Sequence, residues 1–300
     1  MPFPSPGTAD GTHPSETLAH RLGVLNDRLV GLESVVVAFS GGADSALLLA
    51  AAIRALGPGR VLAATGDSAS LSDTERAAAR ETAGKLGARH LFVRTYEMDS
   101  EGYRQNSGSR CWFCKDELVR RLLEVARDQG IRNVATGTNA DDVVDRFRPG
   151  IRAAADLGVV TPLADADLTK SQVRAASRDW GLETWDKPAS PCLSSRIAYG
   201  LTISRSRLSM VEAAERALRD TLRRAAISSY DLRVRDLGDR ALIQVDRSVT
   251  AEVADCAEAL AAVRGAGFPA VDVDPRGFRS GSLNEPLSMS GHHVQNDRST

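Results

Sequence analysis

The sequence has no long apolar run, no signal-peptide pattern and no large charge imbalance, and each absence argues against a class of protein or partner. No stretch approaches the roughly 20 consecutive apolar residues that a membrane-spanning helix needs, so we expect no membrane partner. Residues 1–16 lack the basic and apolar regions of a signal peptide, so we expect a cytoplasmic protein. The formal net charge is −1, which makes nucleic acid an unlikely partner.

Cysteine is also scarce, with four residues in the chain. Without an export signal, paired thiols more often bind metal or react than form structural disulfides. Cys111 and Cys114 form a C-x-x-C pair, which fits a redox dithiol, part of a zinc site or part of an iron–sulfur site. Cys192 follows two prolines in segment 187–196, which favours an extended chain that presents its thiol. Cys256 lies in an amphipathic pattern and is interpreted as a small buried hydrophobic residue.

Short β-branched runs alternate with longer helical patterns, which predicts βαβ units and a parallel sheet. The expected strands are 35–39, 61–65, 90–96, 133–138 and 159–162. The expected helices are 45–55, 72–86, 115–129, parts of 141–157, and 170–180. A second pattern predicts a helix at 206–224, strands at 231–234 and 241–245, a helix at 251–262 and a strand at 270–273. The predicted fold class is α/β, with a parallel-sheet domain followed by a smaller α+β domain.

Composition divides the chain into four regions. Residues 17–200 are expected to bind a nucleotide, and residues 201–284 to form a small domain that binds substrate or mediates oligomerisation. Residues 1–16 and 285–300 have few apolar residues and are expected to be disordered tails. Helix-start signals support the first domain: Ser72 begins the pattern of a capping box, and Thr169 occupies an N-cap position.

An apolar strand runs directly into the loop S-G-G-A-D-S at residues 40–45 and then into an apolar helix. Backbone N–H groups at such a helix start favour an anion, and paired glycines let the backbone approach it closely. The candidate phosphate ligands are Ser40, Gly41, Gly42 and Ser45. Asp44 is better suited to holding Mg²⁺. The loop lacks the Walker A lysine, and a tight strand-to-helix turn without ligand is the alternative interpretation.

Further nucleotide contacts are expected where the second and fourth strands end. Open α/β sheets bind ligands at the carboxyl ends of their strands, where the strand order reverses. The candidates there are Asp67, Ser68, Gly137, Asn139 and Asp141. The last two residues also fit a loop and a helix N-cap, and both roles can hold together.

The motif S-G-G-x-D-S after a first strand resembles that of the PP-loop ATP pyrophosphatases, which cleave ATP between the α- and β-phosphates and adenylate a substrate. Further motifs make the chain similar to the LarE family of PP-loop sulfur transferases. They are R-C-x-x-C-K at 110–115, G-T-N-x-D-D at 137–142, R-P-G at 148–150, P-x-x-P-C-L-x-S-R at 188–196 and G-x-R-S-G-S-L-N at 277–284. The likeness covers roughly residues 17–284.

The resemblance implies that ATP and Mg²⁺ adenylate a carboxylate of pyridinium-3,5-biscarboxylic acid mononucleotide, and that sulfur then displaces AMP to give a thiocarboxylate. Some family members consume the sulfur of a cysteine at the position of Cys192, and others hold a [4Fe–4S] cluster on three cysteines. Because Cys111 and Cys114 are also present, we favour the cluster. A sacrificial thiol and a zinc site completed by Cys256 are the alternatives. The sequence leaves open whether the chain forms a homo-oligomer and whether a separate donor supplies the sulfur.

Candidate substrate residues lie outside the loop. Arg233 and Arg235 fall on one face of a predicted strand, where two guanidiniums favour an anion between them unless they are simply solvated. The resemblance assigns them to the substrate phosphate. Trp112 is interpreted as stacking on a pyridinium ring or filling the core. Arg196 would favour the thiolate of the neighbouring cysteine or bind phosphate, and Glu215 is a candidate catalytic carboxylate.

Three other functions fit parts of the sequence. A PP-loop enzyme that thiolates tRNA would also use a C-x-x-C pair, but the near-zero net charge argues against it. An amide-forming ligase of the NAD or GMP synthetase type would share the adenylation step and leave the cysteines without a task. A nucleotide-sensing or metal-binding protein would keep the loop without catalysis.

Overall fold

A computed structural model describes residues 14–144, 154–188 and 190–279 of the chain. Four parallel strands form its first sheet, in the order β3-β2-β1-β4. They are β1 (Val35–Ala38), β2 (Val61–Asp67), β3 (Arg89–Arg94) and β4 (Asn133–Thr136). Because β2 and β4 flank β1, the strand order reverses beside β1, and the carboxyl ends of these strands form a switch point. The predicted α/β class with a parallel sheet is confirmed.

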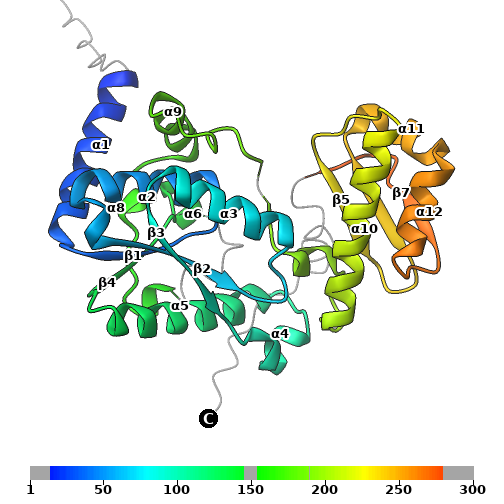
Figure 1. Ribbon diagram of the computed structural model, residues 1–300, viewed down its shortest axis with the longest axis horizontal. Helices are drawn as coiled ribbons and strands as arrows, with labels where there is room; N and C mark the ends of the chain where they lie inside the picture. Colours follow the sequence, from blue (N-terminus) through cyan, green and yellow to red (C-terminus); the bar gives the residue numbers. More distant parts are fainter. Residues whose placement is uncertain (1–13, 145–153, 189, 280–300) are drawn as a thin grey trace, which may run out of the picture.

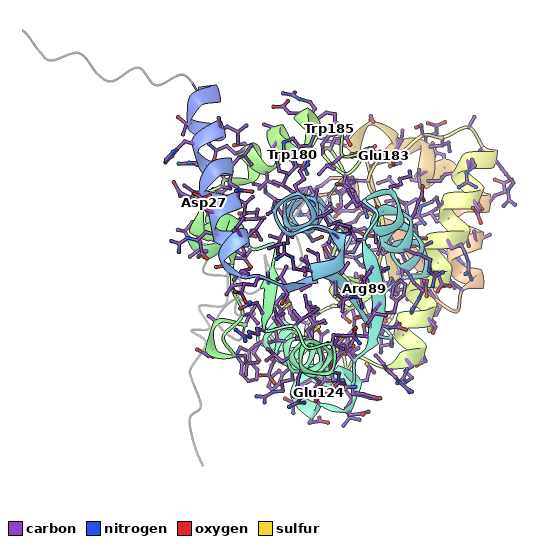
Figure 2. The ribbon with its side chains drawn as sticks, turned by 60° about the vertical axis from the view of Figure 1, so that its left-hand side comes forward. Asp27, Arg89, Glu124, Trp180, Glu183 and Trp185 are labelled. Carbon is purple, nitrogen blue, oxygen red and sulfur yellow. The ribbon has the colours of Figure 1, made fainter. Side chains whose placement is uncertain are left out.

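Helices cover both faces of this sheet (Figure 1). Val35 and Val37 pack with one set of helices, whereas Val36 packs on the opposite face. The first set comprises α1 (Pro14–Gly31), α2 (Ala43–Leu56), α3 (Asp73–Lys85), α8 (Pro162–Asp165) and α9 (Lys170–Asp179). The opposite face is covered by α5 (Arg110–Asp128). Figure 2 shows the two layers, with Trp180 on the side of α2 and Glu124 on α5.

Short helices connect the main elements near the ends of the strands. They are η1 (Pro58–Arg60), η2 (Glu97–Asp99), α4 (Glu101–Arg104), α6 (Ala140–Val144) and η3 (Leu193–Arg196). Among the residues that the structure describes, no helix combines the length and apolar character needed to cross a membrane.

A second, three-stranded sheet follows, in the order β5-β6-β7. Its strands are β5 (Leu232–Asp236), β6 (Ala241–Val245) and β7 (Val271–Val273), with β5 antiparallel and β7 parallel to β6. Its helices are α10 (Arg205–Arg224), η4 (Arg247–Val249), α11 (Thr250–Asp255) and α12 (Ala257–Gly265). Tyr103, Leu193 and Ile197 belong to the core of this sheet, so its packing begins before the predicted boundary at residue 200.

Several predicted elements differ from the observed ones. The strand expected at 159–162 is reduced to a bridge between Ala135 and Val160, because Pro162 starts α8. The single helix expected at 251–262 is two helices, since the backbone of Cys256 is extended between them. The helix expected from residue 115 begins at Arg110, and α1 begins within the expected tail 1–16.

Some sequence predictions lie outside the described residues. They are most of the tails at 1–16 and 285–300, the R-P-G motif at 148–150, the middle of the pattern at 141–157 and residues 280–284 of the last motif.

Candidate active site

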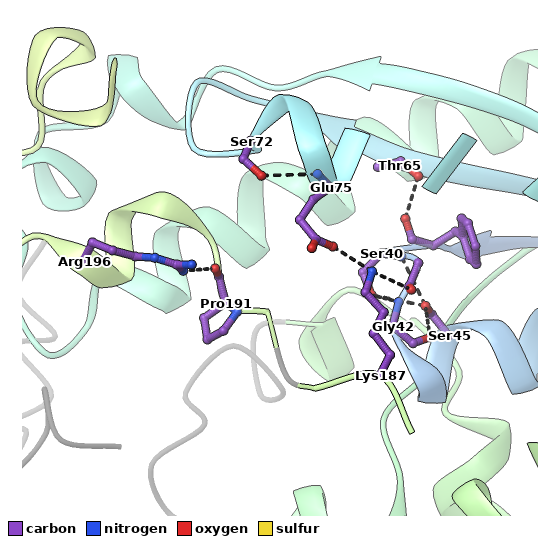
Figure 3. Close-up of polar contacts among 11 residues, drawn as sticks. Ser40, Gly42, Ser45, Thr65, Ser72, Glu75, Lys187, Pro191 and Arg196 are labelled. Carbon is purple, nitrogen blue, oxygen red and sulfur yellow. Dashed lines mark hydrogen bonds and ion pairs between the residues drawn. The ribbon is translucent and has the colours of Figure 1, made fainter. Parts of the chain in front are cut away.

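The loop at 40–45 joins β1 to α2 and is held by its own hydroxyl groups (Figure 3). The Ser45 hydroxyl donates to the Gly42 carbonyl at 3.1 Å and lies 3.1 Å from the Ser40 hydroxyl. The Ser40 hydroxyl in turn accepts from the backbone N–H of Gly42 at 3.3 Å. The loop is therefore ordered around the first turn of α2, the end of the helix that attracts anions.

Two glycines bring other segments against this loop. Gly41 has a φ of 71°, and an added Cβ would lie 3.2 Å from Ala79 Cα of α3. A Cβ on Gly137, after β4, would lie 2.8 Å from the backbone N of Ser45. The contact at Gly137 would force the backbone to move, and at Gly41 the positive φ would strain any residue with a Cβ, so both positions favour glycine.

A cavity of about 590 Å³ opens at the carboxyl ends of β1, β2 and β4. Its lining includes predicted nucleotide ligands from all three strand ends, namely Ser40, Gly42, Asp44, Ser45, Ser68 and Gly137. The same lining contains Cys111, Cys114, Cys192 and Arg196. The structure thus brings the predicted phosphate loop and the three cysteines to one cavity.

The other predicted nucleotide ligands are outside this lining and have structural partners. Asp67 pairs with Arg76 at 2.5 Å, and this guanidinium lowers the pKa of the Asp67 carboxyl below its usual range. Asp141 accepts from the backbone N–H of Lys170, at the start of α9. Asn139 caps α6 and also donates from Nδ2 to Asp44 Oδ1 at 3.0 Å. Asn139 therefore caps the helix as predicted and contacts the carboxylate that is predicted to hold Mg²⁺, while its own nucleotide role stays a prediction.

The C-x-x-C pair lies in the first turn of α5, so Cys111 and Cys114 are one helical turn apart. The sequence did not predict this helical placement. Cys111 is exposed and Cys114 is half-buried. Burial raises the pKa of the Cys114 thiol above its usual range, and the neighbouring Cys192 raises it further.

Long-range hydrogen bonds bring the segment that carries Cys192 to α5. The backbone carbonyl of Ser194 accepts from Arg110 Nη1 at 2.9 Å, and the Ser194 hydroxyl lies 2.5 Å from Tyr103 Oη. The backbone N–H of Leu193 donates to the Ser70 carbonyl at 2.9 Å. Arg110 and Tyr103 are buried, so these contacts position the segment firmly beside the first turn of α5.

Arg196 and Glu215 form an ion pair, although the sequence analysis predicted a separate role for each. The Glu215 carboxylate accepts from Arg196 Nε at 2.9 Å, and both side chains are buried. Arg196 Nη1 also donates to the carbonyls of Pro191 and Cys192. In this arrangement Arg196 holds the backbone around the exposed Cys192 thiol.

The two strand arginines lie next to the same segment. Val234 packs into the small core, while Arg235 Nη1 donates to the Ser195 carbonyl at 3.0 Å. Arg233 lies over the ring of Phe278, with its Cζ 4.4 Å from the ring centroid. Burial lowers the pKa of Arg235 to about 10, and the positive charge of Arg233 contributes to this shift. Neither arginine lines the 590 Å³ cavity, and binding of a substrate anion by them stays a prediction.

Trp112 is partly exposed, at 36%, and its ring packs edge-on against Phe113 at 5.2 Å between centroids. It is absent from the lining of the 590 Å³ cavity. The structure therefore places Trp112 at the surface of the first turn of α5, and stacking on a substrate ring stays a prediction.

Three charged residues near the cavity were missed by the sequence reasoning. Lys187 Nζ donates to the Gly41 carbonyl at 3.2 Å and pairs with Glu75. Glu97 lines the cavity at 2% exposure, and its oxygens accept no hydrogen bond from the described residues. Lys115 also lines the cavity, and burial lowers its pKa. Only Lys115 had a signal, as part of the motif R-C-x-x-C-K.

Within the described parts of the chain, no group of three or more His, Cys, Asp or Glu side chains is assembled to hold a metal ion. The three cysteines share a cavity, but the structure does not bring their thiols into a ligand set.

Comparison with known proteins gives two matches that extend over most of the chain. An uncharacterized protein of Synechocystis is 38% identical over 260 residues, which cover 86% of this chain and 94% of that protein. Pyridinium-3,5-bisthiocarboxylic acid mononucleotide synthase of Lactiplantibacillus plantarum is 32% identical over 275 residues, which cover 91% of this chain and 97% of that enzyme.

A more distant match supports the wider superfamily. Argininosuccinate synthase of Methanothermobacter thermautotrophicus is 24% identical over 169 residues, which cover 52% of this chain and 41% of that enzyme. No family model matches the chain. The phosphate loop on a parallel sheet and the near full-length match to the synthase lead to one assignment: this chain belongs to the LarE family of PP-loop sulfur transferases.

Proposed function

We propose that this chain is a cytoplasmic ATP-dependent sulfur transferase that acts on pyridinium-3,5-biscarboxylic acid mononucleotide, in the synthesis of the nickel-pincer nucleotide cofactor. The observation that carries the proposal is the shared cavity, whose lining contains the phosphate loop and the exposed thiol of Cys192. An enzyme that activates a carboxylate with ATP and then attacks it with sulfur needs these two groups in one place.

The first step is adenylation of the substrate. A carboxylate oxygen attacks the α-phosphorus of ATP, the bond to the bridging oxygen breaks, and pyrophosphate leaves. The loop at 40–45 binds the phosphates through backbone N–H groups and hydroxyls. Asp44, which Asn139 contacts, would hold Mg²⁺, and this ion would supply positive charge to the phosphate oxygens.

The second step is displacement of AMP by sulfur. A sulfur nucleophile attacks the activated carbonyl carbon, the bond from that carbon to the AMP oxygen breaks, and a thiocarboxylate forms. Arg196 and Ser194 position the segment from which Cys192 acts. Arg233 and Arg235 lie beside this segment and are proposed to bind the substrate phosphate.

The same three cysteines have the donor chemistry of an iron–sulfur site. Cys111, Cys114 and Cys192 line one cavity, and three thiolates would leave one iron of a [4Fe–4S] cluster without a protein ligand. When bound, such a cluster would supply an exchangeable sulfide, which a separate sulfur donor would replenish. We favour this arrangement over a sacrificial Cys192 and over zinc.

The function is tested by incubating the protein with ATP, Mg²⁺ and the biscarboxylic acid mononucleotide under anaerobic conditions. We expect substrate-dependent release of AMP and pyrophosphate, and a product in which sulfur replaces a carboxylate oxygen, detected by mass spectrometry. tRNA and amide-ligase substrates such as nicotinic acid adenine dinucleotide are the comparison substrates. If AMP were released only with tRNA or with an amide-ligase substrate, that compound would be the substrate instead of the biscarboxylic acid mononucleotide. If no tested substrate led to AMP release, a non-enzymatic role would be favoured.

The metal is tested separately on anaerobically purified protein. Iron, acid-labile sulfide and zinc are measured in the wild type and in Cys111→Ala. About four irons and four sulfides per chain, lost in the variant, are expected for the cluster. If the protein contained zinc alone, the cysteine site would be structural. If it contained no metal, the transferred sulfur would come from Cys192 itself.

A further inference from the structure

The phosphate loop carries no cationic side chain of its own, since residues 40–45 are serine, glycine, alanine and aspartate. Polyphosphate sites usually include a positive side chain as well as backbone N–H groups, because the β- and γ-phosphates carry several negative charges. The lysine within a Walker A loop does this, and the present loop lacks it. The missing cation must come from elsewhere in the fold.

Lys187 occupies the corresponding place from a distant part of the chain. Its Nζ donates to the Gly41 carbonyl at 3.2 Å and to Glu75 Oε2 at 2.8 Å. Figure 3 shows its side chain between Glu75 of α3 and the loop residues Ser40, Gly42 and Ser45. Glu75 lines the cavity, and Lys187 lies next to it, outside the lining. The side chains of Lys187 and Glu75 are 21% and 22% exposed, so neither is closed off from solvent.

The backbone of Lys187 is fixed from two sides. Arg174 of α9 donates to the carbonyls of Trp185 and Lys187, each at 3.0 Å. Tyr230, just before β5, donates from its hydroxyl to the Asp186 carbonyl at 3.0 Å. These hydrogen bonds fix the backbone of Lys187, so its ammonium group is held beside the loop. The same segment of the chain continues to Cys192.

The Glu75 side chain pairs with Lys187 and does not complete the cap of its own helix. The sequence predicted a reciprocal capping box at the start of α3, but only the half in which Ser72 accepts from the Glu75 N–H is present. At the start of α9 the equivalent pair, Thr169 and Gln172, forms both halves. The Glu75 carboxylate instead neutralises Lys187 beside the loop.

We propose that Lys187 is the cation of the phosphate site and that it exchanges the Glu75 carboxylate for the β- and γ-phosphates when ATP binds. This inference deepens the proposed ATP-dependent function and rests on it. When the bond between the α-phosphorus and the bridging oxygen breaks, Lys187 stays protonated and neutralises charge on the leaving pyrophosphate. Glu75 competes for the same ammonium group and so favours release of pyrophosphate.

The experiment measures binding of Mg²⁺–pyrophosphate, AMP and α,β-methylene-ATP by calorimetry, with the full chain. Lys187→Met is expected to weaken binding of pyrophosphate and of the ATP analogue by about tenfold or more, because a charge-assisted contact is lost. AMP binding should be unchanged, since AMP lacks both of the phosphates concerned. A purely structural role of Lys187 would weaken all three ligands together.

Glu75→Gln supplies the matched variant with the opposite sign. Removing the competing carboxylate should tighten pyrophosphate binding by several-fold, and the double variant should behave like Lys187→Met. Lys187→Arg should recover part of the affinity, which shows that charge and not fold is at issue. Unchanged pyrophosphate binding in Lys187→Met, with an intact wild-type site, would overturn this inference alone. A wild type that binds neither pyrophosphate nor the ATP analogue would overturn the proposed function as well.

Discussion

Arg196 and Glu215 form a buried ion pair between the segment that carries Cys192 and helix α10. The distance from Nε to Oε1 is 2.9 Å, and the side chains are 7% and 9% exposed. The second carboxylate oxygen lies 3.5 Å from Nη2, and the first also accepts from the backbone N–H of Val234. One carboxylate therefore connects three elements around the thiol.

Glu215→Ala should destabilise the protein, because it leaves a buried guanidinium without its partner. The expected loss is about 3 kcal/mol in the free energy of unfolding. Urea unfolding measures it, with the exposed Glu252→Ala of α11 as the control, for which a change within about 0.5 kcal/mol is expected. Equal stability of the two variants would mean that the pair does not hold the segment.

Asp44→Asn should abolish Mg²⁺-dependent adenylation, because the amide cannot replace the negative ligand of the ion. The expected loss of substrate-dependent pyrophosphate release is about 100-fold or more. Asn139→Ala should give a smaller loss, since it removes only the contact that orients Asp44. Normal adenylation by Asp44→Asn would place the metal elsewhere.

Cys192→Ala should separate the two chemical steps. Adenylation needs the phosphate loop and should continue, whereas thiocarboxylate formation should stop because the sulfur-bearing residue is missing. Release of AMP and the mass of the product are measured together. Cys256→Ala is the control and should leave both steps unchanged, because Cys256 lies between α11 and α12, beside the core of the second sheet and outside the cavity lining. Normal sulfur transfer by Cys192→Ala would rule out the mechanism in which this cysteine takes part.

Gly137→Ala should impair nucleotide binding, because its Cβ would lie 2.8 Å from the backbone N of Ser45 and displace the loop. Gly84→Ala is the matched control, since a Cβ there meets no atom within 4 Å. Within α3 the control should stabilise the protein by about 0.5–1 kcal/mol. Binding of α,β-methylene-ATP and thermal unfolding are measured for both, and unaltered binding by Gly137→Ala would contradict the close approach.

His90 should make stability fall in mild acid. Burial, and secondarily the charge of Arg80, lowers the pKa of His90 below its ordinary value of 6.5. The unfolded chain therefore binds this proton more readily than the folded chain, so stability is complete above about pH 6.5 and declines below it.

The measurement is urea unfolding at about pH 7.5 and about pH 5.5. The neutral ring hydrogen-bonds Thr65 at 2.8 Å, a contact that His90→Gln can retain without titrating. The variant should lose less stability than the wild type between the two pH values. An identical loss in both proteins would assign the pH dependence to other groups.

The sequence predicted what depends on local patterns. The loop at 40–45 was identifiable because strand, glycines and helix are adjacent in the chain, and the cap at Thr169 because its signal spans a few residues. The start of α5 was placed too late, since the apolar period becomes regular only after the second cysteine of the pair.

The contacts that assemble the site are not local and were missed. Lys187 is far from Gly41 in the sequence, and nothing in either segment indicates that they meet. Likewise, Arg196 and Glu215 were each named, but their pairing follows from the packing of α10 on η3. The carboxylate of Glu97, which accepts no hydrogen bond within the described part of the chain, had no sequence signal, because its interest depends on its burial in the cavity.

The most direct test of sulfur transfer from this cavity is a count of thiocarboxylate groups formed per chain, with the intact mass of the chain measured in the same sample. With ATP, the biscarboxylic acid mononucleotide and a sulfide source, we expect more than one thiocarboxylate per chain and an unchanged protein mass. One thiocarboxylate per chain with loss of hydrogen sulfide from Cys192 would select the sacrificial route. AMP release without any thiocarboxylate would contradict the account.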